Sequence, residues 1–111
     1  MNFTDESYSN ERIELHGKSF RGCTFTDCEL VYDGDRSPTF ANNRFIDTKF
    51  VFTGASLRTL YFLGNMYHAG EGGKEVIEKT FTDIMNGDVH GHEVSTIIPN
   101  TVDHSIHAAA V

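Results

Sequence analysis

The chain has 111 residues, of which 39% are hydrophobic and 23% are charged, and its formal net charge is −7. This length supports one domain with a modest core, and the negative charge argues against direct binding to nucleic acid or to anionic membranes. The sequence has no apolar run as long as a membrane span and begins with acidic residues where a signal peptide has basic ones, so we expect a soluble, cytoplasmic single domain over residues 1–111.

Large apolar residues recur every five positions in the first half of the chain. The series is apolar at nine of its ten positions, which are Leu15, Phe20, Phe25, Leu30, Asp35, Phe40, Phe45, Phe50, Ala55 and Leu60. Neither a helix, which repeats at about 3.6 residues, nor a strand, which repeats at about 2, produces this period. A chain that turns a corner every five residues does produce it, because each central side chain then points inward.

Four such sides make a coil of about 20 residues, and stacked coils bring like side chains together. The predicted vertical pairs are Phe20 with Phe40, Phe25 with Phe45, and Leu30 with Phe50, and the fourth side holds Leu15, Asp35 and Ala55. Compact residues also precede several centres by two positions, namely Ile13, Cys23, Cys28, Thr48 and Thr53. The two cysteines are too few for a disulfide scaffold or a zinc site, so we expect both to be reduced and buried.

With "CTFTD" and "DTKFV" as its best matches, the stretch 13–60 resembles the pentapeptide-repeat family. Members of that family fold as right-handed quadrilateral β-helices with Phe or Leu at the centre of each repeat and a small residue two places before it. The resemblance implies a mainly β fold, in which residues 11–55 form a short right-handed β-helix of about two to two and a half coils. Asp35 departs from the pattern within "YDGDRSP", which has the composition of an inserted turn.

A small antiparallel β-sheet packed on two helices is the competing fold. The Asp-Gly pair in "ELVYDGDR" is a strong hairpin signal, and simple alternation would explain Leu30 and Tyr32. We favour the β-helix because the antiparallel sheet does not explain why the five-residue register resumes unchanged at Phe40.

Residues 56–85 predict two C-terminal helices. Ser56 suits the N-cap of the first, and the apolar positions of "LRTLYFLGNMYH" predict that this helix is mostly buried. "AGEGG" then breaks the chain, and "KEVIEKTFTDIM" follows with Ile77, Phe81 and Ile84 on one face. We expect this pair to cap the β-helix or to form a dimerisation element. Residues 86–111 predict an extended or disordered tail, in which "VSTIIP" suits one strand against the body or a neighbouring subunit.

The sequence carries few signals for chemistry. His90, His92, His104 and His107 lie in polar tail sequence without cysteine, so we expect no metal site. No nucleophile motif is present, and we expect no catalytic residue, no enzyme activity and no cofactor.

One candidate ligand site remains, around "HAGEGGKE". It differs from a phosphate-binding loop, because residue 68 is not glycine and Lys74 is not followed by Ser or Thr. The first N–H groups of the second helix still suit a small anion. The residues predicted to contact such a ligand are Gly72, Gly73, Lys74, Tyr61 and Tyr67.

The features together predict a non-enzymatic protein-interaction module, an inhibitor or modulator of a protein partner, that forms a homodimer through its helical pair. The alternative is a protein that binds or sequesters a small anion or a nucleotide-type ligand. Some members of the pentapeptide-repeat family imitate DNA and inhibit gyrase as dimers joined by C-terminal helices, which makes DNA mimicry a third hypothesis. We favour it less, because basic residues such as Lys18, Arg21 and Lys49 interrupt the acidic ones.

Overall fold

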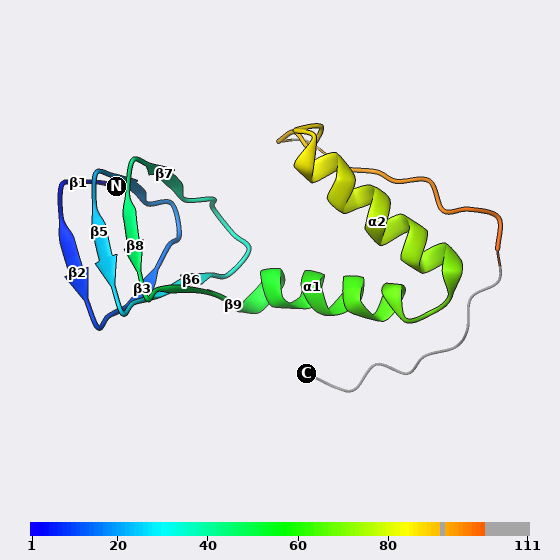
Figure 1. Ribbon diagram of the computed structural model, residues 1–111, viewed down its shortest axis with the longest axis horizontal. Helices are drawn as coiled ribbons and strands as arrows, with labels where there is room; N and C mark the ends of the chain where they lie inside the picture. The colour runs from blue at the N-terminus through cyan, green and yellow to red at the C-terminus, as the bar shows by residue number, and fades with distance from the viewer. Residues whose placement is uncertain (92, 102–111) are drawn as a thin grey trace. The chain divides into compact units, whose positions relative to one another are not determined.

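The computed structural model describes residues 1–91 and 93–101 (Figure 1). Within these residues the chain forms nine short strands and two helices. They are β1 (Asn2–Thr4), β2 (Ser7–Ser9), β3 (Arg12–Glu14), β4 (Ser19–Arg21), β5 (Thr24–Thr26), β6 (Glu29–Tyr32), β7 (Thr39–Ala41), β8 (Arg44–Ile46), β9 (Lys49–Phe52), α1 (Gly54–Tyr67) and α2 (Glu71–Met85). The chain divides into two compact units, which are described in turn: the strand unit, Met1–Thr59, and the helix unit, which begins at Leu60.

The strands of the strand unit form three parallel sheets. Sheet A has the order β1-β4-β7, sheet B has β2-β5-β8, and sheet C has β3-β6-β9. The chain therefore passes through sheets A, B and C in this order three times, and each strand of the first two passes pairs with the strand three places later. The antiparallel alternative is wrong, because every described strand pair is parallel and β6 and β7, on either side of Gly34, lie in different sheets.

The vertical pairs predicted from the five-residue spacing are confirmed. In register, Phe20 lies opposite Phe40, Phe25 opposite Phe45, and Leu30 opposite Phe50. The rings in the first two of these pairs are stacked, with centroids 5.5 and 5.4 Å apart. The spacing therefore predicts which side chains form the columns of the core.

The sheets begin at Asn2, before residue 11, where the predicted β-helix starts. The centres of the first pass are Phe3, Tyr8 and Ile13, which lie opposite Phe20, Phe25 and Leu30. Ile13 is therefore itself a centre, and its assignment as the residue two places before one is wrong. A five-residue count from Leu15 does not reach this pass, because seven positions separate Ile13 from Phe20.

The predicted fourth side does not form a sheet within the described residues. Leu15 is buried, Asp35 is exposed, and Ala55 belongs to α1. The connection from sheet C back to sheet A varies in length along the chain, so it cannot pair regularly. In its second occurrence it is held by the Tyr32 hydroxyl, which donates to the Asp35 carbonyl oxygen at 3.3 Å.

A residue with positive φ turns the corner after each strand of sheets A and B. These residues are Asp5, Asn10, Gly22, Asp27, Asn42 and Asp47, each two places after a centre, with φ between 47° and 67°. Glycine, and next to it Asn and Asp, adopt this left-handed conformation at the lowest cost. The corner signature is therefore an aromatic residue, any residue, and then Asp, Asn or Gly. It occurs at residues 3–5 and 8–10, and it identifies the first pass that the five-residue count misses.

The position two places before a centre links one pass to the next. Cys23 and Cys28 occupy it in the second pass, and both are buried with free thiols, as predicted. The backbone N–H of Cys23 donates to the side-chain oxygen of Asn43 at 2.7 Å, and that of Cys28 donates to the Thr48 hydroxyl at 3.3 Å. A polar side chain at this position therefore accepts a hydrogen bond from the pass beneath it.

Both helices begin earlier than predicted. α1 starts at Gly54, and Ser56 does not cap it, because the Ser56 hydroxyl lies 2.6 Å from the carbonyl oxygen of Tyr32, at the end of β6. α2 starts at Glu71, so that Gly72 and Gly73 lie in its first turn instead of breaking the chain. The connection turns at the residue before, where φ is 134°. Neither helix in the described part of the chain is long and apolar enough to span a bilayer.

The prediction that α1 is mostly buried is wrong. None of its residues is buried, and Phe62 retains 60% exposure. Helical spacing identifies an apolar stripe, but it does not identify the surface that covers the stripe. The buried apolar side chains of α2 are Val76 and Ile77, and its next apolar positions, Phe81 and Ile84, are exposed.

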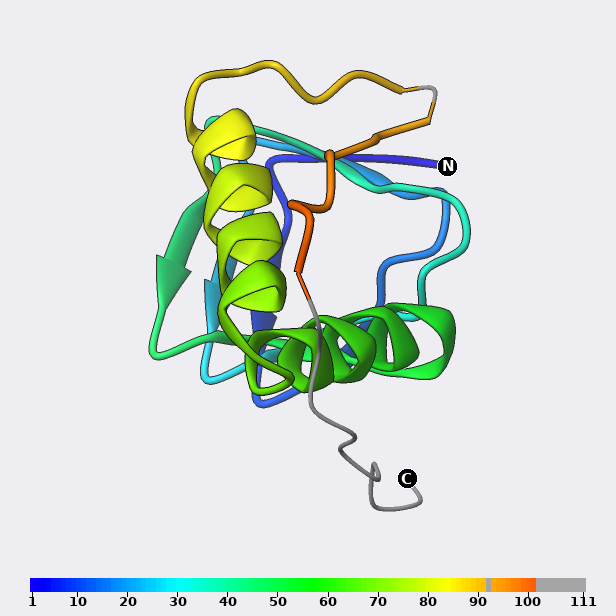
Figure 2. The same ribbon diagram turned by 90° about the vertical axis from the view of Figure 1, so that its right-hand side faces the viewer.

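Residues 93–101 run back along α2 (orange in Figures 1 and 2). The Thr96 hydroxyl lies 3.0 Å from the Thr80 hydroxyl, and Gly72 packs so closely against Thr101 that a Cβ atom would overlap its side chain. The segment forms no strand among the described residues.

Candidate functional site

The structure brings together part of the predicted ligand site, within the helix unit. Lys74 lies in the first turn of α2, and its Nζ atom is 5.5 Å from the centre of the Tyr67 ring at the end of α1. Tyr61 is half-buried on α1. The contact of these residues with a ligand stays a prediction.

The two glycines have a packing role that the sequence did not reveal. A Cβ atom at Gly73 would overlap the backbone carbonyl oxygen of Met66, near the end of α1. Gly73 therefore permits the close approach of α2 to α1, as Gly72 permits that of Thr101. Glycine suits both a tight helix contact and an anion loop because it lacks Cβ, so its presence does not distinguish them.

The charges near Lys74 do not favour an anion. Glu71 lies in the first turn of α2, and its Oε1 atom is 3.9 Å from Lys74 Nζ. A carboxylate at this place already interacts favourably with the positive end of the helix dipole. An anionic ligand would have to compete with Glu71 for both the lysine and the helix end.

Metal-ligating side chains are not clustered in the described part of the chain. No group of three or more His, Cys, Asp or Glu side chains in residues 1–91 and 93–101 is placed to hold a metal ion. Every buried polar side-chain atom in this part of the chain has a hydrogen-bond partner. Of the four tail histidines, His90 is exposed, and His92, His104 and His107 lie outside the described residues.

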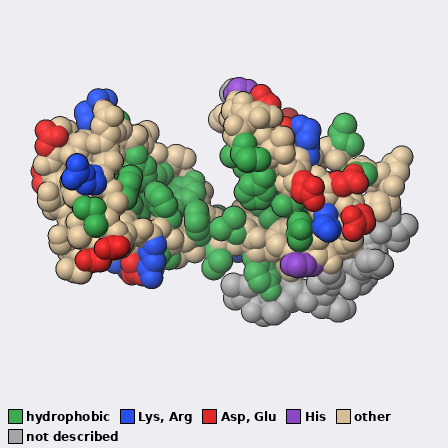
Figure 3. Space-filling model, viewed as in Figure 1, with side chains coloured by type: hydrophobic (Ala, Val, Ile, Leu, Met, Phe, Trp, Pro, Cys, Tyr) green, Lys and Arg blue, Asp and Glu red, His purple; other side chains and the backbone are tan. Residues whose placement is uncertain are grey.

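A ladder of opposite charges lies on sheet C. Glu29 accepts from Arg12 at 3.2 Å, and Lys49 Nζ lies 3.5 Å from its second oxygen. The hydrogen bond from Arg12 is the main cause that lowers the pKa of Glu29, and Lys49 adds to it. Basic and acidic side chains are interspersed over the strand unit (Figure 3), whereas a DNA mimic requires a continuous acidic surface.

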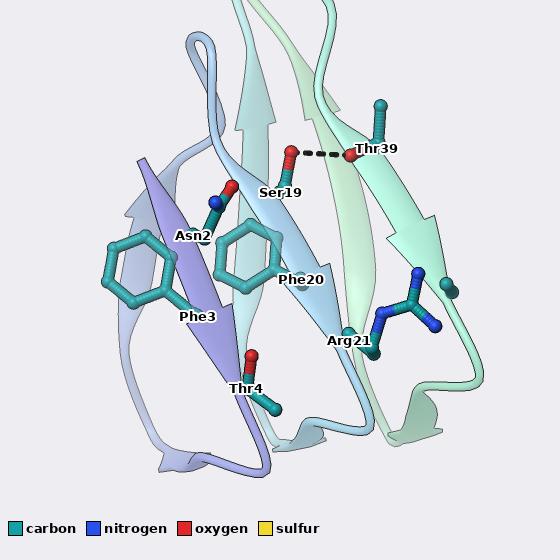
Figure 4. A pocket seen from close by; sticks show the side chains of 8 residues that line it. Asn2, Phe3, Thr4, Ser19, Phe20, Arg21 and Thr39 are labelled. Carbon is teal, nitrogen blue, oxygen red and sulfur yellow. Dashed lines mark hydrogen bonds between the residues drawn. The ribbon is translucent and has the colours of Figure 1, made fainter.

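A hollow of about 310 Å³ lies along sheet A (Figure 4). Its polar lining includes Asn2 and Arg21, together with Ser19 and Thr39, whose hydroxyls bond to each other at 2.6 Å. No His, Asp or Glu lines it, so the hollow offers no side chain that acts as a general base near pH 7.

The third pass leaves an apolar end on the strand unit (Figure 3). Each of β7, β8 and β9 has a partner on one side only among the described strands. Phe45 is 45% exposed, Phe50 is 52% exposed, and Phe52 is also exposed. A mainly apolar hollow of about 370 Å³ adjoins them, lined by Leu15, Tyr32, Ser37, Pro38, Phe50 and Phe52. The five-residue spacing identified Phe45 and Phe50 as core but did not identify the pass at which the core ends.

No protein-family model, no curated protein and no solved structure matches the chain.

Proposed function

We propose that the chain is a non-enzymatic protein-interaction module, built on a short right-handed β-helix of the pentapeptide-repeat type, that works as a homodimer. Three parallel sheets visited in a fixed order support the β-helix. Crossover connections between parallel strands of one sheet are right-handed in nearly all proteins, which supports the hand.

The observation that carries the dimer is the uncovered apolar surface of the helices. Leu60 and Phe62 on α1 and Phe81 and Ile84 on α2 are exposed. A helix that is apolar at such positions normally packs against another surface. Two helices with so small a buried core do not supply the stability of an independent unit, so we expect a further surface to cover them.

A second copy is the partner that best fits this surface. A second copy is available wherever the chain is made, so covering the apolar surface of the helices requires no other protein. Arg58 is the only charged residue in α1, and the acids that give the chain its net charge of −7 lie elsewhere. Two α1 helices therefore approach without like acids facing each other, and a symmetric pair buries the same patch on both copies.

The test is the mass in solution by light scattering over a wide range of concentrations. We expect a dimer for the wild type and a dissociation constant raised at least about 30-fold by Phe62→Glu, the loss typical of a central aromatic contact. Thr59→Glu, which adds the same charge at an exposed polar position of α1, is the matched control and leaves the dimer intact. A wild-type chain that stays monomeric at all concentrations contradicts the proposed homodimer.

A further inference from the structure

The segment 95–99 has the side-chain pattern of one more strand for sheet C. Ile97 retains 89% exposure and Ile98 retains 65%, although both are β-branched residues that favour strands. In β6 and β9, the second and third strands of sheet C, the four residues from two before the centre to one after it are 28–31, "CELV", and 48–51, "TKFV". Residues 95–98, "STII", repeat this order of a small residue, a polar residue, a large apolar residue and a β-branched apolar residue.

The hydroxyl of Ser95 completes a hydrogen bond that this register needs. In the existing stack the Thr48 hydroxyl accepts from the backbone N–H of Cys28, one pass beneath it. With Ile97 placed over Phe50, Ser95 comes over Thr48 and supplies the equivalent acceptor. Ile97 then covers a ring that is half exposed, and Ile98 extends the column of Val31 and Val51.

Pro99 selects sheet C among the three. Two places after a centre, sheets A and B have residues with positive φ, a conformation that the proline ring excludes. In sheet C the equivalent residue is Phe52, which continues β9. The backbone N–H groups of Lys49 and Thr53 donate to carbonyl oxygens of the pass beneath. Alternate residues of a parallel strand bond to the same neighbouring strand, so the N–H of Phe52 is not among these donors. A proline stacked over Phe52 therefore removes no hydrogen bond to the strand beneath it.

We infer that residues 95–99 of one copy add as a parallel strand to the free edge of β9 in a second copy, with Ile97 over Phe50 and Pro99 over Phe52. The inference rests on the proposed homodimer. Each copy presents the open edge of β9 and the unpaired segment 95–99. In a two-fold dimer, the segment of each copy therefore pairs with the β9 edge of the other copy. Within one chain the segment is held on α2 through Thr96 and Thr80, and its isoleucines remain exposed.

Disulfide trapping between variants that each carry one added cysteine tests the register. Neighbouring strands lie about 4.8 Å apart, which is within the reach of a disulfide between paired positions. We expect Val51→Cys and Ile98→Cys chains of different mass, mixed and mildly oxidised, to form a mixed disulfide. The control pair, Ile46→Cys on β8 with Ile98→Cys, is expected to link at least about tenfold more slowly. The native cysteines are buried and do not compete.

The outcomes separate the two proposals. A wild-type dimer without the link between positions 51 and 98, or with equal linking at position 46, overturns the added strand and leaves the homodimer standing. A chain carrying both Val51→Cys and Ile98→Cys that closes an internal disulfide at every dilution overturns the choice of a second copy. A monomeric wild type overturns the homodimer itself. Ile97→Asp adds a second readout, because it is expected to weaken the dimer at least about tenfold, whereas Val94→Asp, outside the added strand, leaves it unchanged.

Discussion

Replacing Phe25 by alanine tests whether the core is a stack of aromatic columns. The ring is fully buried and is stacked between Tyr8, at 5.2 Å, and Phe45, at 5.4 Å, with Phe20 edge-on at 5.2 Å. Removing a buried Phe side chain costs about 3–5 kcal/mol, and each aromatic pair adds about 0.5–1.5 kcal/mol. We therefore expect Phe25→Ala to lower the free energy of unfolding by about 4–5 kcal/mol.

The matched control is Phe45→Ala, one pass further along the same column. Phe45 has a ring neighbour in its column on one side only and is half exposed, so its loss is expected to cost about 2 kcal/mol. Urea unfolding followed by circular dichroism at one protein concentration measures both variants. Equal losses for Phe25→Ala and Phe45→Ala would refute the conclusion that the core ends at the third pass.

Three further changes test the turns and the charge ladder. Gly34→Ala places a Cβ atom 2.6 Å from a backbone nitrogen of α1 at a φ of 90°. We therefore expect it to lower the free energy of unfolding, measured in urea, by more than about 2 kcal/mol. The control Gly64→Ala, at a helical position with open space around it, is expected to raise this free energy by about 0.5–1 kcal/mol. Asp27→Val, at a φ of 52°, is expected to cost at least about 1–2 kcal/mol while Asp27→Gly costs little, and equal effects would contradict the corner assignment. The hydrogen bond from Arg12 lowers the pKa of Glu29, so the ionised Glu29 side chain stabilises the fold at pH values above the ordinary carboxyl range. This stabilisation is lost as the pH falls through the lowered pKa. The urea midpoint of Glu29→Gln is therefore expected to fall less than that of the wild type between about pH 5 and pH 3.

The columns of the core could be predicted from the sequence because the corners of sheets A and B are evenly spaced. Five positions separate Phe20 from Phe25, and five separate Phe40 from Phe45, so a simple count finds them. The connection from sheet C to sheet A has no such constraint, since it forms no strand, and its varying length concealed the first pass. The corner residues carry the better signal, because positive φ restricts the choice of residue whatever the spacing.

The candidate site could be predicted less well, because its residues have more than one physical role. Gly73 is required by the approach of α2 to the Met66 carbonyl oxygen, and the same residue type suits an anion loop. The apolar stripe of α1 predicts that this face of the helix is buried, but the stripe does not identify the surface that covers it. Sequence patterns therefore predicted contacts between passes, where the geometry repeats, and failed where a contact occurs once.

The two ends of the strand unit differ, and this difference bears on the kind of assembly. In the column of sheet C, Ile13 in the first pass is 9% exposed, whereas Phe50 in the third is 52% exposed. Two equally open ends would favour addition of copies head to tail, which does not close and leads to filaments. Because the apolar surface is concentrated at the third pass, each copy has one end that gains from being covered. An assembly that covers this end in both copies is closed, so the same asymmetry that leaves β9 open also favours a dimer over a filament.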